Sequence, residues 1–401
     1  MRVRPSTKVM KYLRPLVATA VVTVLVSAVI GGLLRVGVGQ TLLATDAGAA
    51  VFGRAAVFHA ALMLSGFFGT VIAIERAVAA RVRWAFAAPA LSGAGALALL
   101  GGATALAAAL SLAGAAVFVA VHALLLKRQA MTHTRLLALA AGAWLAGNAL
   151  FAAGRGADAP VWWFVFLVLT VGAERLEMTR FAPRKPAAEP ALLGIVAALL
   201  AGALASAWQP AAGGVVYGLA LIALGAWFAL YDVARRTVRA PGLPRYMALC
   251  LLSGYAWLVV GGLAWMGTAL GCPGRDMALH ALGLGFVFSM VMGHAPVILP
   301  AVAKVKLRFG ARFYVPVVAL QASLALRLFG GAEDAGLKAL GSALNAASVA
   351  LFAAIVVSAI VAARRAARQA PPPKPVDAAD AEARLAAALA AARARRGDAP
   401  H

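Results

Sequence analysis

Four of the six histidines in this sequence lie in segments apolar enough to cross a membrane: His59, His122, His280 and His294. The segment "LHALGLGFVFSMVMGHAPVILP" at residues 279–300 carries two of them. Ionisable side chains are costly in hydrocarbon, so each histidine needs a partner or a function. A neutral imidazole can bind a metal or the iron of a haem.

His59 and His280 share the same local sequence. Residues 53–64 read "GRAAVFHAALML" and residues 274–285 read "GRDMALHALGLG", so each histidine follows Gly-Arg after four residues and precedes alanine. Both lie about one turn, about 5–10 Å, below the outer membrane surface. Two imidazoles at matching depth on neighbouring helices are suited to bind one haem iron from both sides. The sequence therefore predicts a bis-histidine haem site.

Other residues near these histidines fit such a site. Small residues after each histidine leave room for a macrocycle between the helices. Arg54 and Arg275, five residues before their histidines, are predicted to pair with haem propionates at the headgroup level. The alternatives stay open that each histidine is a hydrogen-bonded helix contact and that each arginine reaches toward the membrane surface.

His294 lies 14 residues after His280, about 21 Å deeper on nearly the same helix face. It is a candidate metal ligand, with His122 as the possible partner for a second, inner haem. The alternative is that His294 binds a backbone carbonyl freed by Pro296 and Pro300.

The composition predicts an integral membrane protein. The 401 residues are 63% hydrophobic and 13% charged, with a mean hydropathy of +0.88. Twelve apolar segments begin at about residues 15, 55, 84, 104, 134, 160, 190, 212, 246, 277, 311 and 337. Of the 37 Lys and Arg residues, 31 fall on the N-terminal side of this arrangement. This asymmetry places both termini in the cytoplasm and accounts for the net charge of +23 without nucleic acid as a partner.

Residues 1–363 form the predicted transmembrane domain, and residues 364–401 a basic cytoplasmic tail rich in Pro, Ala and Arg, with a helix after its proline run. The longest outer loop is expected at about residues 37–52. A third Gly-Arg sequence, "GRGADAPVWWF" at residues 154–164, precedes the sixth segment. Recurrence at segments two, six and ten indicates three units of four helices. Asn148, Gln321 and Asn345 are expected to hydrogen-bond between helices.

This layout resembles the core subunit of haem-copper oxidases, in which histidines on helices 2 and 10 hold a low-spin haem. The resemblance assigns that role to His59 and His280. The sixth and seventh segments contain no histidine, and Ala278 and Leu282 stand where a paired His-x-His would be. Activity as a terminal oxidase is therefore not expected.

A further resemblance is to the NnrS-like bacterial membrane proteins. It is carried by "FHAALMLSGFFGTVIAIERAV" at residues 58–78 and "HALGLGFVFSMVMGHAPVILPAV" at residues 280–302. It implies a bacterial inner-membrane protein that binds haem b, with copper as a further metal, and that acts in the response to nitric oxide. Membrane lipid and a periplasmic or membrane electron donor are the expected partners.

The expected function is electron transfer, or nitric-oxide response or protection, by a haem near the periplasmic face. The alternative is a twelve-helix secondary transporter, with His294 and a helix broken near Pro296 as its substrate or proton site.

Overall fold

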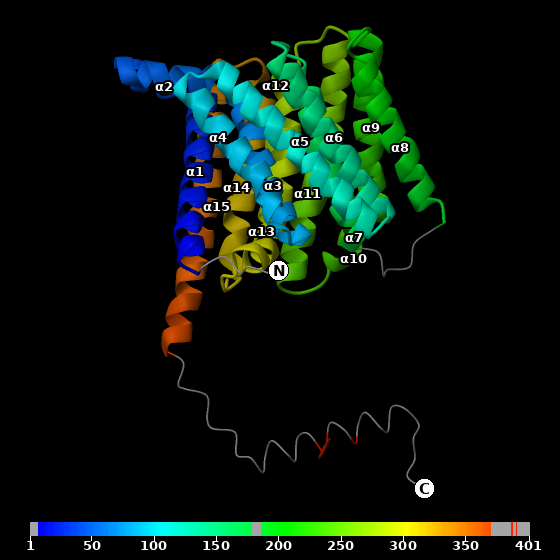
Figure 1. The fold of residues 1–401 in the computed structure, drawn as a ribbon. Helices are drawn as coiled ribbons and strands as arrows, with labels where there is room; N and C mark the ends of the chain where they lie inside the picture. The colour runs from blue at the N-terminus through cyan, green and yellow to red at the C-terminus, as the bar shows by residue number, and fades with distance from the viewer. Residues whose placement is uncertain (1–6, 179–185, 370–385, 388–389, 391–401) are drawn as a thin grey trace.

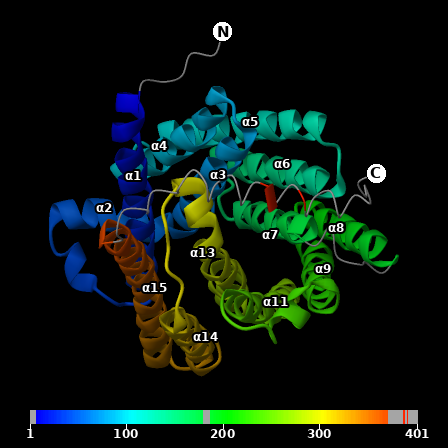
Figure 2. The same cartoon turned by 90° about the horizontal axis from the view of Figure 1, so that it is seen from below.

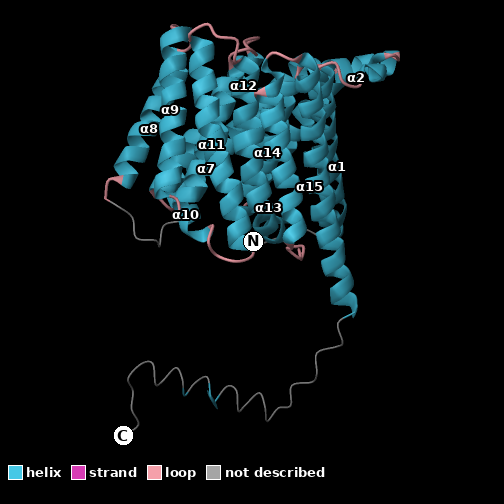
Figure 3. Cartoon of the chain, turned by 180° about the vertical axis from the view of Figure 1, so that it is seen from behind, coloured by secondary structure: helices cyan, strands magenta, loops and turns pink. Residues whose placement is uncertain are grey.

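The computed structural model describes residues 7–178 and 186–369, together with 386, 387 and 390. This part of the chain is helical and contains no strand (Figure 3). Twelve of its helices are long and apolar enough to cross a membrane, which confirms the predicted number. Helices are expected here because they satisfy every backbone polar group internally in a solvent without hydrogen bonds.

The membrane-spanning helices and the segments that extend them are as follows: α1 (Thr7–Leu34), η2 (Ala61–Gly69) with α3 (Thr70–Ala80), η3 (Arg83–Phe86) with α4 (Ala87–Gly101), α5 (Thr104–Arg128), α6 (Thr132–Ala152), α7 (Ala159–Met178), α8 (Ala188–Ala205), α9 (Pro210–Tyr231), α11 (Leu243–Ala269), α12 (Arg275–His280) with η4 (Ala281–Phe288) and α13 (Ser289–Ala303), η5 (Ala311–Phe313) with α14 (Tyr314–Leu328) and η6 (Gly330–Ala332), and α15 (Ala335–Gln369). A short helix, α10 (Ala234–Thr237), follows α9.

The helices stand side by side in one bundle (Figure 1). The start of α1 and the end of α15 lie at the same end of it, below in Figure 1, as an even number of crossings requires. We call this the terminal end of the bundle. The helix α12 lies at the opposite end, which we call the far end.

Two spans, α7 and α12–α13, are the most buried of the bundle, which is seen end-on in Figure 2. Their most apolar windows are 83% and 67% buried. Those of η2–α3, α9 and α11 are 56% buried, against 28% for α1, α5 and α15. The spans that begin next to His59 and His280 are thus more than half buried.

The expected outer loop at residues 37–52 lies between the first two membrane-spanning helices, and it is largely helical. It contains η1 (Gln40–Leu43) and most of α2 (Asp46–Val57), which projects sideways from the far end of the bundle (Figure 1). Thr45 caps α2 because its hydroxyl accepts a hydrogen bond from the amide of Gly48 at 3.1 Å. A carboxylate in the first turn and the alanines that follow also favour a helix here.

The last helix continues beyond the predicted domain boundary at residue 363. The helix α15 has 35 residues and ends at Gln369. At 1.5 Å per residue it is about 50 Å long, well beyond the hydrocarbon thickness of about 30 Å. Except for residues 386, 387 and 390, the remainder of the predicted tail lies outside the described residues.

Buried amides join the helices as expected for two of the three predicted residues. The Oδ1 atom of Asn148 accepts hydrogen bonds from the Ser65 hydroxyl at 2.8 Å and from the Trp163 indole at 3.2 Å. Gln321 accepts a hydrogen bond from the indole of Trp257. These bonds link η2, α6 and α7 in one group and α11 to α14 in the other. They fix the rotation of each helix about its own axis.

Replacing Asn148 by Leu tests the first group. We expect Asn148→Leu to lower the free energy of unfolding by about 1–2 kcal/mol, because two donors in the membrane interior lose their acceptor. Unfolding in mixed detergent micelles measures the change. Ser358→Ala is the control, because that hydroxyl bonds only to Ile355 of its own helix. Equal stability of the two variants would contradict the assigned role of Asn148.

Candidate functional site

The structure brings His59 and His280 together. Their ring centroids are 6.3 Å apart, and their planes are inclined by only 16°. His59 lies just before η2, and His280 is the last residue of α12. Residues separated by more than 200 positions in the sequence thus form a histidine pair inside the bundle.

Backbone hydrogen bonds fix the tautomer of both rings. The Nδ1 atom of His59 lies 2.7 Å from the carbonyl oxygen of Ala28, and that of His280 lies 2.9 Å from the carbonyl oxygen of Asp276. A carbonyl only accepts, so each Nδ1 carries the proton and donates. Each Nε2 therefore has its lone pair available for a metal, which is the usual arrangement of metal-binding histidines.

The separation of the rings matches the requirement for one metal ion between them. Two imidazoles that bind an ion from opposite sides, each about 2 Å from it, have ring centroids about 6 Å apart. The centroids of His59 and His280 are 6.3 Å apart. The donor set and its spacing therefore fit an iron with two axial imidazoles.

The helix after each histidine has the same unusual form. The π-helical segments η2 and η4 begin at Ala61 and Ala281, within two residues of their histidines. Short π-helical segments are rare and occur frequently at functional sites. The similar sequences at residues 53–64 and 274–285 thus also share a similar backbone conformation.

A cavity extends beside the histidine pair, bounded by η2, η4, α1, α14 and α15. The cavity is open on one side, and its empty volume, including the space at the opening, is about 830 Å³. Apolar side chains form most of its wall, as in most ligand pockets. Gly32 is required where α1 approaches the pair, since a Cβ atom there would lie 2.7 Å from Cε1 of His59. Of the small residues expected to make room, Ala60 and Gly283 line the cavity.

One side of the cavity is polar. Arg327 contacts the Asp276 carboxylate at 3.0 Å, and Lys338 contacts it at 3.2 Å. The same carboxylate lies 3.1 Å from Nδ1 of His280. Two cations on one carboxylate leave an excess positive charge beside the cavity, which favours an anionic group in it.

Two buried side chains that line the cavity have polar atoms without partners among the described residues. These atoms are Nε of Arg327 and both amide atoms of Asn345, and the two residues are only 7% and 3% exposed. Buried polar groups are nearly always hydrogen-bonded. Arg327 and Asn345 therefore indicate a ligand that carries polar or charged groups on this side of the cavity.

The predicted propionate partners Arg54 and Arg275 lie elsewhere. Arg54 donates to the carbonyl oxygen of Leu100 at 2.7 Å, and Arg275 donates to that of Ala157 at 2.8 Å. Neither lines the cavity. The sequence motifs do not point to Arg327, and its one signal of function is that it is a basic residue within an apolar segment.

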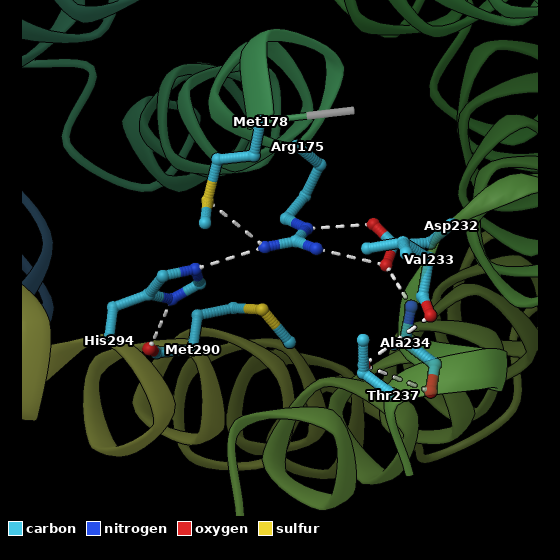
Figure 4. A network of polar contacts seen from close by, with 8 residues as sticks. All are labelled: Arg175, Met178, Asp232, Val233, Ala234, Thr237, Met290 and His294. Carbon is cyan, nitrogen blue, oxygen red and sulfur yellow. Dashed lines mark hydrogen bonds and ion pairs between the residues drawn. The ribbon is translucent and has the colours of Figure 1, made fainter. Parts of the chain in front are cut away.

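His294 lies on the helix α13, where it faces Arg175 (Figure 4). Its Nδ1 donates to the carbonyl oxygen of Met290 at 2.7 Å, and its Nε2 lies 3.4 Å from Nη1 of Arg175. Arg175 in turn binds Asp232 at 2.7 and 2.9 Å. A guanidinium beside Nε2 disfavours a metal cation at that nitrogen. The helix continues through both of its prolines.

His122 bonds within its own helix. Its Nδ1 donates to the carbonyl oxygen of Phe118 at 3.0 Å, and its ring packs on that of Phe118 with centroids 4.3 Å apart. No ring contact between His122 and His294 occurs in the described part of the chain. The described residues contain no group of three or more His, Cys, Asp or Glu that could hold a metal ion.

Comparison with known proteins identifies one family. No curated protein and no solved structure matches the chain. The family described as a domain of unknown function (DUF8744) matches residues 14–361, which include every membrane-spanning helix at least in part. The chain therefore belongs to the DUF8744 family.

Proposed function

We propose that this membrane protein binds a b-type haem between His59 and His280 and acts in electron transfer, or in the response to or protection from nitric oxide. The observation that carries the proposal is the histidine pair itself. The centroids are 6.3 Å apart, the rings are nearly parallel, and both Nδ1 atoms are held by carbonyls. Helix-borne histidines held in this way are common axial ligands of haem iron.

The two histidines would hold the iron from opposite sides. A bound haem supplies one-electron exchange at this position. Because His59 and His280 would fill both axial positions, the chain favours electron transfer over gas binding unless one histidine withdraws. The apolar wall of the cavity would keep water away from a bound haem, which is one way in which a protein sets a redox potential.

Arg327 and Asn345 would hold the propionates in place of Arg54 and Arg275. A haem propionate is a carboxylate, which accepts hydrogen bonds from a guanidinium and from an amide NH₂. The unpartnered Nε of Arg327 and amide of Asn345 supply such donors on the polar side of the cavity. The excess positive charge around Asp276 acts in the same direction.

The resemblance to the haem-copper oxidase core is supported by the pattern of burial. In chain order the twelve spans have windows 28, 56, 44 and 28% buried, then 44, 83, 33 and 56%, then 56, 67, 44 and 28%. The second span of each set of four is the most buried of its set. This pattern supports three four-helix units. The excess of Lys and Arg on the side of the termini favours a cytoplasmic location for both, in a bacterium. Lipid and a periplasmic or membrane electron donor would be the partners.

The histidines are tested by the optical spectrum of the purified protein. We expect a low-spin haem spectrum with split bands on reduction, and its loss in both His59→Ala and His280→Ala. His122→Ala is the matched control, since that buried histidine lies outside the cavity and should leave the spectrum unchanged. Protein without iron from haem-replete cells would overturn the proposal.

The propionate contacts are tested with Arg327→Gln. Loss of a charged hydrogen bond costs about 1.5–3 kcal/mol, so we expect haem affinity to fall about 10–100-fold. Transfer of haem to apomyoglobin measures the change. Arg275→Gln is the control, because Arg275 binds only a backbone carbonyl outside the cavity. A larger loss in Arg275→Gln would restore the assignment based on sequence.

Substitution of Asp276 tests whether the protein tunes the redox potential of the proposed haem through His280. The Asp276 carboxylate lies beside Nδ1 of His280 and should make that imidazole a stronger donor, which stabilises oxidised iron. We expect Asp276→Asn to raise the midpoint potential in a redox titration. The control Asp158→Asn removes an exposed carboxylate that pairs only with Arg155. An unchanged potential in Asp276→Asn would contradict this role.

A further inference from the structure

A second cluster of charged side chains lies on helices that end at the terminal end of the bundle. The Nη2 atom of Arg76 contacts Oε1 of Glu75 at 2.9 Å and Oε1 of Glu174 at 2.6 Å. Because both contacts use the same nitrogen, these two carboxylate oxygens lie within about 5.5 Å of each other. Two acids on the neighbouring spans α3 and α7 thus share one cation.

The three side chains are largely removed from solvent. The side chain of Arg76 is 10% exposed, and those of Glu75 and Glu174 are 24% and 19% exposed. Two like charges at this separation in a medium of low dielectric constant oppose each other's ionisation. One guanidinium can balance only one of the two carboxylates.

The neighbouring charged groups do not correct the imbalance. Arg175, beside Glu174 in sequence, forms a two-point ion pair with Asp232 (Figure 4). Glu177 adds a further negative charge near Arg76 and Glu174. The glutamates Glu75, Glu174 and Glu177 therefore act on Arg76, while the neighbouring Arg175 is paired with another acid.

The two nearby histidines do not supply the missing charge. His294 acts on Glu75 from α13, and its Nε2 faces Arg175. His122 is buried on α5 near Arg76. Both donate from Nδ1 to a carbonyl of their own helix, and the adjacent guanidinium groups disfavour a second proton on either ring.

Two buried polar atoms at this end of the bundle lack a hydrogen-bond partner among the described residues. Nε of Arg76 is a donor, Nε2 of His122 is an acceptor, and neither has a partner among the described residues. Arg76 and His122 are only 8% and 2% exposed. Buried polar atoms are nearly always hydrogen-bonded, so these two atoms favour the binding of water beside them. Such water can carry protons to the carboxylates.

We propose that Glu75, Arg76 and Glu174 form a proton-binding site. One carboxylate takes up a proton and becomes a neutral carboxylic acid, while the other stays ionised and balances Arg76. The proton exchanges with the water at the terminal end of the bundle. This site is separate from the histidine pair and operates whether or not haem is bound.

Infrared spectroscopy of the full-length protein in lipid vesicles tests the proposal. A protonated carboxyl group has a C=O stretching band that a carboxylate lacks and that shifts in D₂O. We expect this band at a pH at which exposed carboxyl groups are fully ionised. Either Glu75→Gln or Glu174→Gln should remove it, because the remaining carboxylate then pairs with Arg76 alone.

Glu177→Gln is the matched control, because Glu177 lies on the same helix as Glu174 but makes no ion pair with Arg76. The band should persist in this variant. Its absence from the unmodified protein, or its persistence in either Glu75→Gln or Glu174→Gln, would overturn the proposal. Glutamine keeps the size of the side chain and an oxygen that accepts from Arg76, so both variants are suited to fold.

Discussion

Hydrocarbon offers no hydrogen bonds, so the polar side chains of this bundle must find their partners inside the protein. Asn148 and Gln321 bind indoles and hydroxyls on other helices, and Arg175 is matched by Asp232. Most imidazole Nδ1 atoms in the bundle bind a carbonyl for the same reason. Against this background the few unpaired buried atoms carry information, because the membrane supplies nothing to satisfy them. In the described part of the chain, all of them except Oη of Tyr255 belong to residues near the histidine pair or near the shared carboxylates.

The two sites lie toward opposite ends of the same interior helices. The span formed by η2 and α3 follows His59 and carries Glu75 and Arg76 sixteen and seventeen residues later. At 1.5 Å per residue this separation is about 24 Å, most of the hydrocarbon thickness. Electrons at one end and protons at the other would therefore be handled by different side chains on a common support. Phe67, Phe68 and Phe288 pack between them and separate the two polar regions.

Sequence reasoning succeeded where a short pattern determines the structure. Apolar runs predicted the twelve spans, and the repeated Gly-Arg…His-Ala sequence predicted that His59 and His280 would meet. It did not predict the partners of long side chains that can reach several neighbouring helices. Arg54 and Arg275 occupy the predicted turns but bind nearby carbonyls, whereas Arg327 reaches the cavity from the eleventh span. No local pattern shows which helix will lie opposite another, so neither Arg327 nor Asn345 was assigned to the cavity.

The π-helical segments have a mechanical consequence for the helices that contain them. A π-helical turn holds about one residue more than an α-helical turn, so it rotates the rest of the helix by about 100° relative to a regular continuation. In η2 and η4 this rotation falls between the histidine and the remainder of its span. Each of these spans therefore consists of two helical parts, one before and one after the π-helical segment, that are rotated relative to each other by a fixed angle. The direction in which each imidazole points is therefore determined separately from the direction of the charged residues at the terminal end. Residues on one part of the span can change without rotating the other part.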